Sequence, residues 1–264
     1  MKSLIILKIG GSIITDKKSD EPKVDYENLE RISKEIKQGY DSDKINLILI
    51  HGAGSYGHNI VKRTGINNGI VNKKQLVDFA ETQRLQNELN SIITKKLIEN
   101  GLPTIPCQAS SFMIGDGGRL QEIDIEAIEG MLKIDMIPVL YGVPVYDKLQ
   151  KCSILSGDQI APYLARKLNA ELIIHATNVN GIYTKDPNQF DDAEHISEIT
   201  VDNFEEIKKL VSGSLDTDVT GGMLNKISEL MNIGVSSQII SGIIPGNIIK
   251  ALRGECIGTV VRGV

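Results

Sequence analysis

Residues 4–12 read LIILKIGGS, an apolar run of strand length that ends at two glycines. A run this short, rich in isoleucine and leucine and followed by glycine, indicates a buried strand of a sheet. The same pattern recurs along the chain. Further strands are predicted at 45–52 (INLILIHG), 136–142 (MIPVLYG), 171–178 (ELIIHATN), 236–242 (SSQIISG) and 258–263 (GTVVRG).

Longer amphipathic stretches separate these runs. Apolar residues at helical spacing predict helices over 26–38, 74–100, 157–168, 204–211, 222–233 and 248–252. Strand–helix alternation of this kind predicts an α/β fold with a mostly parallel sheet covered on both faces. Ligands of such sheets gather at the carboxyl ends of the strands. Residues 108–153, which have short strands and turn signals, are expected to form a hairpin-rich excursion over one face.

Composition excludes several classes of protein. The 264 residues suffice for one large α/β domain or two small ones, and 41% are hydrophobic, which is ordinary for a globular chain. A net charge of −5 predicts no nucleic-acid or membrane partner. Three cysteines without a CxxC pair argue against a disulfide framework, and the four histidines show no metal-ligand spacing. The apolar run at 4–7 is too short for a signal peptide, so we expect a cytoplasmic protein.

Three strand-to-helix junctions are rich in glycine. They are KIGGS (8–12) with Lys17 nearby, HGAGSYGH (51–58), and DVTGGMLNK (218–226), where Lys226 lies one turn into the helix. Glycines before a helix let backbone N–H groups approach an anion closely, and lysines add fixed positive charge. Each junction could also be a plain tight turn, with Lys8 solvated and His58 on the surface. Together they favour phosphate binding.

The second junction also matches GxGxxG, from Gly52 to Gly57. This pattern invites a dinucleotide-binding oxidoreductase as an alternative. That fingerprint requires an acidic residue at the end of a strand about twenty residues further on. The chain offers Gly69, Asn72 and Lys73 in that neighbourhood, followed by a long helix, so the alternative is weak.

Asp158 follows Ser156 and Gly157 at the start of a predicted helix. An aspartate there is either a helix cap or a group that holds catalytic lysines in place. The loop at 177–183 (TNVNGIY) follows a strand and suits a nucleotide. Neither the Walker pattern GxxxxGK[ST] nor the HRD and DFG motifs of protein kinases occurs. Glycine junctions, lysines and one aspartate suit phosphoryl transfer, in which positioning and charge neutralisation dominate.

Four ordered blocks, KIGGS (8–12), SGD (156–158), TNVNGIYTKDP (177–187) and DVTGG-x3-K (218–226), resemble the amino acid kinase superfamily over nearly the whole chain. The resemblance implies an open αβα sandwich with a mostly parallel central sheet. It implies a single domain over 1–264, with the acceptor in the amino half (about 1–170) and ATP in the carboxyl half (about 171–264). A homodimer is also expected.

Within the superfamily, HGAGSYGH (51–58) resembles the isopentenyl phosphate kinase family, which is typical of archaea. This family phosphorylates isopentenyl phosphate to isopentenyl diphosphate, a precursor of isoprenoids in the alternative mevalonate route. Fosfomycin kinases share a similar histidine. A kinase of the same fold acting on fosfomycin or an amino acid therefore stays open, as does a non-catalytic nucleotide-binding regulator.

By this resemblance Lys8 and Lys226 lie along the ATP phosphates, Lys17 neutralises the transferring group, and Asp158 holds Lys8 and Lys226 in register. Magnesium would travel with ATP, because the sequence offers no clear protein cage for it and no metal-ligand residue is predicted. The residues implied in ATP binding are Lys8, Gly10, Gly11, Ser12, Gly54, Thr177, Asn178, Tyr183, Gly222 and Lys226. Asn178 and Asn180 depart from the family, which usually has aspartate at the first position and often at the second.

The acceptor would meet two kinds of surface. By resemblance, Ala53, Gly54, His58 and Gly157 would bind its phosphate. An apolar tail needs an apolar pocket, for which Phe79 and Ile154 are candidates, along with Leu76; each could equally be a core residue.

Overall fold

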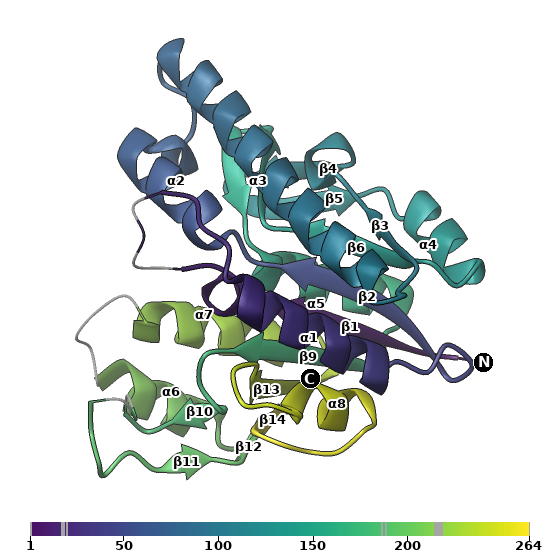
Figure 1. Cartoon of the computed structure of the whole chain (residues 1–264). Coiled ribbons are helices and arrows are strands. Elements are labelled where there is room, and N and C mark those ends of the chain that lie inside the picture. Colours follow the sequence, from purple (N-terminus) through teal and green to yellow (C-terminus); the bar gives the residue numbers. More distant parts are fainter. Residues whose placement is uncertain are drawn as a thin grey trace.

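The computed structural model describes residues 2–16, 19, 21–185, 187, 189–213 and 219–263, with side chains throughout except at 212, 213 and 219–222 (Figure 1). The strands of the main sheet are β1 (Ser3–Ile9), β2 (Ile45–His51), β3 (Thr104–Pro106), β6 (Ile137–Tyr141), β9 (Leu172–Thr177), β12 (Glu198–Ile199), β13 (Ser236–Ser241) and β14 (Thr259–Val261). The helices are α1 (Tyr26–Gly39), α2 (His58–Thr64), α3 (Lys74–Glu99), α4 (Glu126–Lys133), α5 (Gly157–Leu168), α6 (Phe204–Gly213), α7 (Val219–Met231) and α8 (Asn247–Leu252).

The central sheet has eight strands in the order β12-β14-β13-β9-β1-β2-β6-β3. Six of its seven neighbouring pairs are parallel, and β13 with β14 is the antiparallel pair. β1 lies between β2 and β9, so the first apolar run of the chain occupies the middle of the sheet. The predicted α/β fold with a mostly parallel sheet is confirmed.

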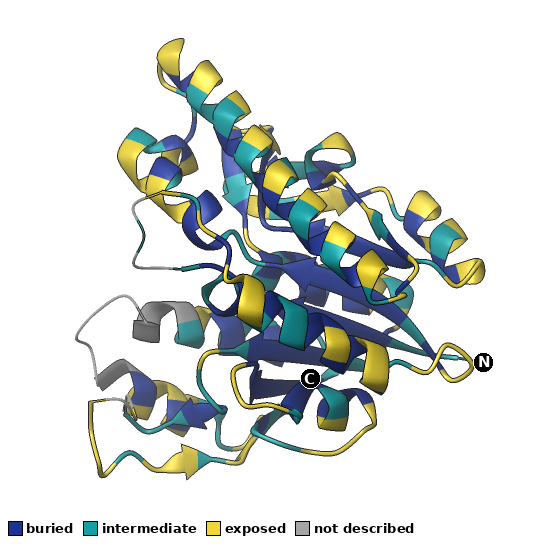
Figure 2. Ribbon diagram, viewed as in Figure 1, coloured by how far each residue is buried: buried dark blue, intermediate teal, exposed yellow. Residues whose placement is uncertain are grey.

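Two hydrophobic cores lie on opposite faces of this sheet. Ile5, Leu7 and Ile9 of β1 belong to one core, which α1, α3 and α8 cover. Ile6 belongs to the other, which α4, α5, α6 and α7 cover. Figure 2 shows the strands in the middle of the main sheet as buried, while the helices expose their outer faces. Because side chains alternate along a strand, Lys8 follows Ile6 onto the α5 face.

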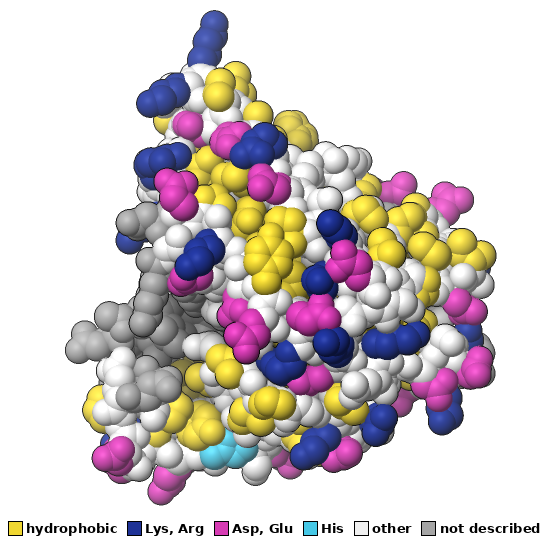
Figure 3. Space-filling view, in the orientation of Figure 1, with side chains coloured by type: hydrophobic (Ala, Val, Ile, Leu, Met, Phe, Trp, Pro, Cys, Tyr) yellow, Lys and Arg dark blue, Asp and Glu magenta, His cyan; other side chains and the backbone are white. Residues whose placement is uncertain are grey.

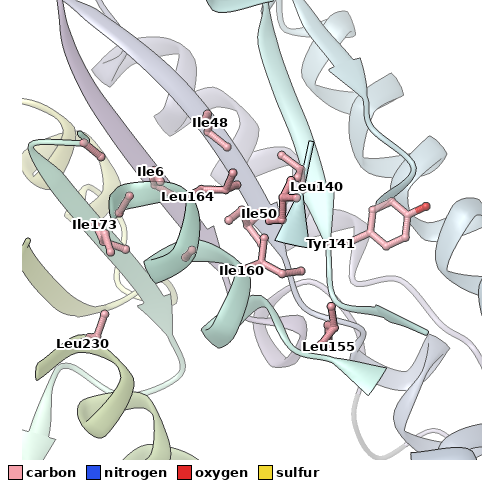
Figure 4. Packing of buried hydrophobic residues seen from close by; sticks show 14 of the residues in the cluster. Ile6, Ile48, Ile50, Leu140, Tyr141, Leu155, Ile160, Leu164, Ile173 and Leu230 are labelled. Carbon is pink, nitrogen blue, oxygen red and sulfur yellow. The ribbon is translucent and has the colours of Figure 1, made fainter. Parts of the chain in front are cut away.

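The core on the α5 face is tightly interleaved. Figure 4 shows Ile160 and Leu164 of α5 among strand side chains such as Ile6, Ile50 and Leu140, all of which are fully buried. Helix α5 begins at Gly157, so this packing also fixes the position of Asp158, the second residue of the helix. A buried apolar surface thus orients a charged group at the sheet edge.

The predicted elements lie within two residues of their predicted bounds, with one exception. The helix predicted over 222–233 begins three residues earlier, at Val219. The strand predicted over 258–263 spans only Thr259–Val261. The strand begins only after Gly258, because the φ angle of this residue is 66°, which lies in the left-handed region and is incompatible with a strand.

The expected hairpin-rich excursion is a second sheet of four strands in the order β5-β4-β7-β8. Its strands are β4 (Met113–Asp116), β5 (Arg119–Ile123), β7 (Val143–Asp147) and β8 (Lys151–Leu155). A small pair, β10 (Ile182–Tyr183) and β11 (His195–Ile196), lies in the carboxyl half.

The surface in Figure 3 mixes acidic and basic side chains rather than segregating them. This agrees with the small negative net charge. No helix in the described ranges is both long enough and apolar enough to cross a membrane.

A buried carboxylate organises the second sheet. The Asp147 side chain accepts hydrogen bonds from the backbone N–H groups of Gly117, Gly118, Leu149 and Gln150, at 2.9–3.0 Å. Burial by itself raises the pKa of Asp147, but these four donors outweigh it and lower the pKa to about 2. The charged form is therefore the stabilising one.

We expect Asp147→Asn to lower the free energy of unfolding by about 2 kcal/mol at pH 7, because an amide cannot accept from all four donors. The difference in unfolding free energy between wild type and Asp147→Asn should be complete above pH 4 and shrink as the pH falls toward 2. The reason is that the pKa of Asp147 is lower in the folded than in the unfolded protein. Urea titrations at several pH values would measure it. Asp116→Asn, at an exposed position in β4 of the same sheet, should change stability little, and an equal loss in both variants would contradict this account.

Candidate active site

The carboxyl edge of the main sheet ends in glycines. The N–H groups of Gly10, Gly52, Gly142 and Gly242 donate to carbonyls of Ala176, Ile9, His51 and Thr177 at 2.7–3.2 Å. Each bond continues the ladder by one residue, after which the chain leaves the sheet. The glycine-rich junctions predicted from the sequence at 8–12 and 51–58 therefore lie together at this edge.

Two of these junctions are in backbone contact. A Cβ atom added to Gly11 would lie 2.3 Å from the Gly54 nitrogen, and one added to Gly52 would lie 2.5 Å from the Gly11 nitrogen. Gly54 has a φ angle of 52°, and a Cβ there would lie 2.0 Å from Thr15 Oγ1. Only glycine permits this approach, which holds the two loops as one unit.

Three charged residues meet above β1. Lys8 Nζ lies 3.0 Å from Asp158 Oδ1, and Lys226 Nζ donates to the same oxygen at 2.6 Å. The three come from β1, α5 and α7, 218 positions apart along the chain at the extremes (226 − 8). Asp158 is thus not only a helix cap: Ser156 is the N-cap residue of α5, and the aspartate bridges the two lysines.

Burial and charge set the protonation of this group. Burial alone would raise the pKa of Asp158, but Lys8 and Lys226 hold it well below its usual range. Burial, followed by the charge of Lys8, lowers the pKa of Lys226 to about 8. The site therefore carries one net positive charge at neutral pH, from two ammonium groups and one carboxylate.

The sequence analysis missed a fourth member, His175. This side chain in β9 is 1% exposed, and its Nδ1 lies 3.3 Å from Asp158 Oδ1. Chiefly through burial, its pKa is lowered to about 4, so the ring is neutral. The available signal was its position: His175 interrupts the apolar run of the strand LIIHAT.

The predicted acceptor-phosphate residues lie around the second junction and the start of α5. Gly54 begins the short 3-10 helix η2 (Gly54–Tyr56), Ala53 precedes it, and the exposed His58 is the first residue of α2. Gly157 is buried, and a Cβ there would approach Ile50 Cγ2 to 3.1 Å. Of these positions, Gly157 adjoins the lysine: a Cβ there would lie 3.5 Å from Lys8 Cε.

The predicted tail-pocket residues are less clearly gathered. Phe79 in α3 and Ile154 in β8 are each partly buried, so neither is an ordinary core residue. Leu76 is 54% exposed. Its side chain therefore does not belong to an enclosed pocket in the described chain.

The predicted nucleotide residues follow β9 and β1. Thr177 ends β9 and donates to Asn178 Oδ1 at 3.2 Å, while Tyr183 stacks edge-on against His195. Ser12 lies in the 3-10 helix η1 (Gly11–Ile13), and Gly222 lies within α7. Lys17, with Asp186 and Asp218 of the two carboxyl-half motifs, falls outside the described residues.

Asn180, one of the two departures from the family pattern, makes contacts that do not themselves require asparagine. Asn180 Oδ1 accepts from the Ser241 N–H and from Asn247 Nδ2, both at 3.3 Å. In both contacts the oxygen accepts, a role that an aspartate could also fill. At this position the asparagine therefore fixes the nucleotide loop against β13.

No cluster of three or more histidine, cysteine, aspartate or glutamate side chains with metal-binding geometry occurs among the described residues. Beside Lys8 and Lys226, the described side-chain groups with free lone pairs are the Asp158 carboxylate, which is already paired, and the His175 ring.

Comparison with known proteins agrees with this geometry. The model of the amino acid kinase family matches residues 3–244, and the chain belongs to that family. The kinase class makes ATP the phosphoryl donor. A dinucleotide-binding role for Gly52–Gly57 is therefore not supported; the segment forms η2 and the start of α2 instead.

The chain is similar to two archaeal proteins named isopentenyl phosphate kinase. It is 40% identical to that of Methanothermobacter thermautotrophicus, over 98% of this chain and 99% of the relative, and 38% identical to that of Methanocaldococcus jannaschii, over 97% of each. A solved isopentenyl phosphate kinase structure superposes with a TM-score of 0.84 at 37% identity, covering 98% of this chain and 99% of that one. The resemblance indicated by the sequence motifs is confirmed.

We expect Gly11→Ala to destabilise the protein by about 1–3 kcal/mol and to weaken ATP binding, because the new methyl group must push the two loops apart. Urea unfolding and calorimetric titration with ATP would measure both effects. Gly130→Ala is the control: its Cβ meets no atom within 4 Å, and in helix α4 it should stabilise by about 0.5–1 kcal/mol. Normal ATP affinity in Gly11→Ala would contradict the close approach.

We expect the affinity for ATP to fall as the pH rises above about 8, where free Lys226 loses its proton. Bound phosphates favour the charged form, so the dissociation constant should rise by up to about tenfold per pH unit there. Calorimetry from pH 6.5 to 9.5 would measure it; phosphate groups, with a second pKa near 6, no longer titrate above pH 8. Lys226→Met should bind more weakly with a flat profile, and an equally flat wild-type profile would refute the assignment.

Proposed function

We propose that this protein transfers the γ-phosphoryl group of ATP to isopentenyl phosphate, giving ADP and isopentenyl diphosphate. The observation that carries the proposal is the Lys8–Asp158–Lys226 bridge at the strand ends, beside the HGAGSYGH loop. Full-length similarity to proteins named isopentenyl phosphate kinase supports the choice of acceptor.

The chemistry needs charge neutralisation more than proton transfer. A phosphate monoester has a second pKa near 6, so the attacking oxygen of the acceptor is already ionised at neutral pH and requires no general base. Two unit charges about 4 Å apart repel by roughly 4 kcal/mol at an effective dielectric of about 20. Lys8 and Lys226 would offset this repulsion along the ATP phosphates, and Lys17 would do so on the transferring group.

Asp158 would act through the lysines. Its carboxylate holds Lys226 by a charge-assisted hydrogen bond and Lys8 by an ion pair, which limits the freedom of both ammonium groups before ATP arrives. Positioning of this kind lowers the reorganisation needed in the transition state. Asp158 is thus a positioning residue in this scheme.

The acceptor half would be about residues 1–170 and the ATP half about 171–264 of a single domain. Backbone N–H groups at Ala53, Gly54 and Gly157 and the His58 ring would bind the acceptor phosphate. Phe79 and Ile154 would contact its apolar tail. The loop with Thr177, Asn178 and Tyr183 would contact the nucleotide, and the glycines at 10, 11 and 222, with Ser12, would approach its phosphates.

Three further features belong to the proposal. Mg²⁺ would be held by the phosphates of ATP itself, because the paired Asp158 is poorly placed to serve as a ligand. Its contribution would be to neutralise the β- and γ-phosphates. We also propose a homodimer and a cytoplasmic location.

The direct test is ADP release from ATP and Mg²⁺ with isopentenyl phosphate, compared with fosfomycin, glutamate, acetylglutamate, carbamate and UMP. We expect fast turnover with isopentenyl phosphate alone. His58→Ala should raise the KM for isopentenyl phosphate by about tenfold or more, since a hydrogen bond to a charged group contributes about 1.5–3 kcal/mol. The KM for ATP should change little.

Lys62→Ala is the matched control, because this exposed cation lies one turn further along the same helix, α2. It should leave both KM values near those of the wild type. Turnover with another acceptor, unaffected by His58→Ala, would replace isopentenyl phosphate by that acceptor. ATP binding without turnover of any acceptor would instead favour a regulator.

A further inference from the structure

His175 lies at the centre of the charge cluster without a role in the scheme above. In β9 it is in register with Lys8 of β1 on one side and with Ile239 of β13 on the other. Asp158 reaches it from α5, and Lys226 contributes its charge from α7. Among the described residues, the charged groups that act on the imidazole are therefore Asp158, Lys226 and Lys8.

One oxygen receives all three nitrogen groups. Asp158 Oδ1 lies 2.6 Å from Lys226 Nζ, 3.0 Å from Lys8 Nζ and 3.3 Å from His175 Nδ1. Lys226 donates a hydrogen bond to this oxygen and Lys8 is paired with it, so both ammonium groups lie closer to it than the imidazole does. The imidazole Nδ1 therefore lies near this oxygen without making a well-aligned hydrogen bond to it.

The imidazole is otherwise unsatisfied. Neither ring nitrogen makes a well-aligned hydrogen bond within the described residues, although both are fully buried. Buried polar atoms without partners cost free energy, so this arrangement requires an explanation. A state in which Nδ1 gains a full hydrogen bond would supply one.

We propose that His175 is a positioning residue for phosphoryl transfer, whose neutral imidazole, protonated on Nδ1, holds the Asp158 carboxylate when Lys8 and Lys226 turn their protons toward the phosphates. The inference rests on the proposed kinase function. Phosphates compete with Asp158 for the ammonium protons, and the carboxylate oxygen then has room for the Nδ1–H group. Asp158 stays in place between the lysines throughout.

Neutrality of the ring suits this role. Burial, assisted by the charges of Lys226 and Lys8, keeps its pKa near 4 although Asp158 acts in the opposite direction. An uncharged donor holds the carboxylate without cancelling the negative charge that keeps both lysines in register. A third cation in its place would compete for Asp158 and for the phosphates.

Two substitutions separate positioning from packing. His175→Leu fills the space without a donor, while His175→Asn places an amide N–H close to the position of Nδ1. We expect kcat to fall about tenfold or more in His175→Leu, with both KM values within about threefold of the wild type. His175→Asn should recover kcat to within about threefold. If His175 had a purely structural role, kcat would fall in both variants.

Ile173→Val is the control for burial, because this fully buried residue lies two positions earlier on the same face of β9. It should lower the melting temperature and leave kcat unchanged. Wild-type kcat in His175→Leu, or equal losses in the Leu and Asn variants, would overturn the proposal.

A second readout does not depend on turnover. In protein labelled with 15N at histidine, we expect the His175 ring to be the neutral Nδ1–H tautomer at pH 7, with the Nδ1 resonance moving when a non-hydrolysable ATP analogue is added. An Nε2–H tautomer or an imidazolium would overturn the proposal. Absence of turnover with isopentenyl phosphate, combined with the expected tautomer and shift, would instead reject that acceptor and leave the role of His175 standing.

Discussion

The shared oxygen of Asp158 is the contact on which the rest of the site depends. It joins Lys8, at the second-last position of the central strand, to Lys226, in a helix near the other end of the chain. Without the carboxylate, two buried ammonium groups would repel each other. With it, the protein maintains a concentrated positive charge that is ready to meet phosphates.

Hydrophobic packing makes this contact possible. The alternation of β1 sends Ile5, Leu7 and Ile9 into one core and leaves Ile6 and Lys8 on the opposite face. Helix α5 packs on that second face and carries Asp158 to the lysine. The free energy that fixes these charges therefore comes mainly from apolar burial, because paired buried charges contribute little net stability themselves.

Backbone geometry joins the two glycine-rich junctions at 8–12 and 51–58. Gly11, Gly52 and Gly54 let two loops touch through their main chains, which leaves no room for any side chain at these positions. The same closeness brings the loop that carries His58 beside the strand that carries Lys8. Both the conformational freedom of glycine and the fixed twist of the sheet contribute to this close approach of the two loops.

The sequence alone determined the parallel sheet, most of its helices and the motifs at 8–12, 51–58, 156–158 and 218–226, because apolar periodicity and glycine spacing are local properties. Tertiary structure alone decided that one oxygen of Asp158 serves both lysines, and that His175 faces it. Strand register sets these contacts: pairing of β9 with β1 places His175 opposite Lys8, although 167 positions (175 − 8) separate them. No local pattern encodes which residues of distant strands become neighbours, so the charge cluster emerges only when the chain is folded.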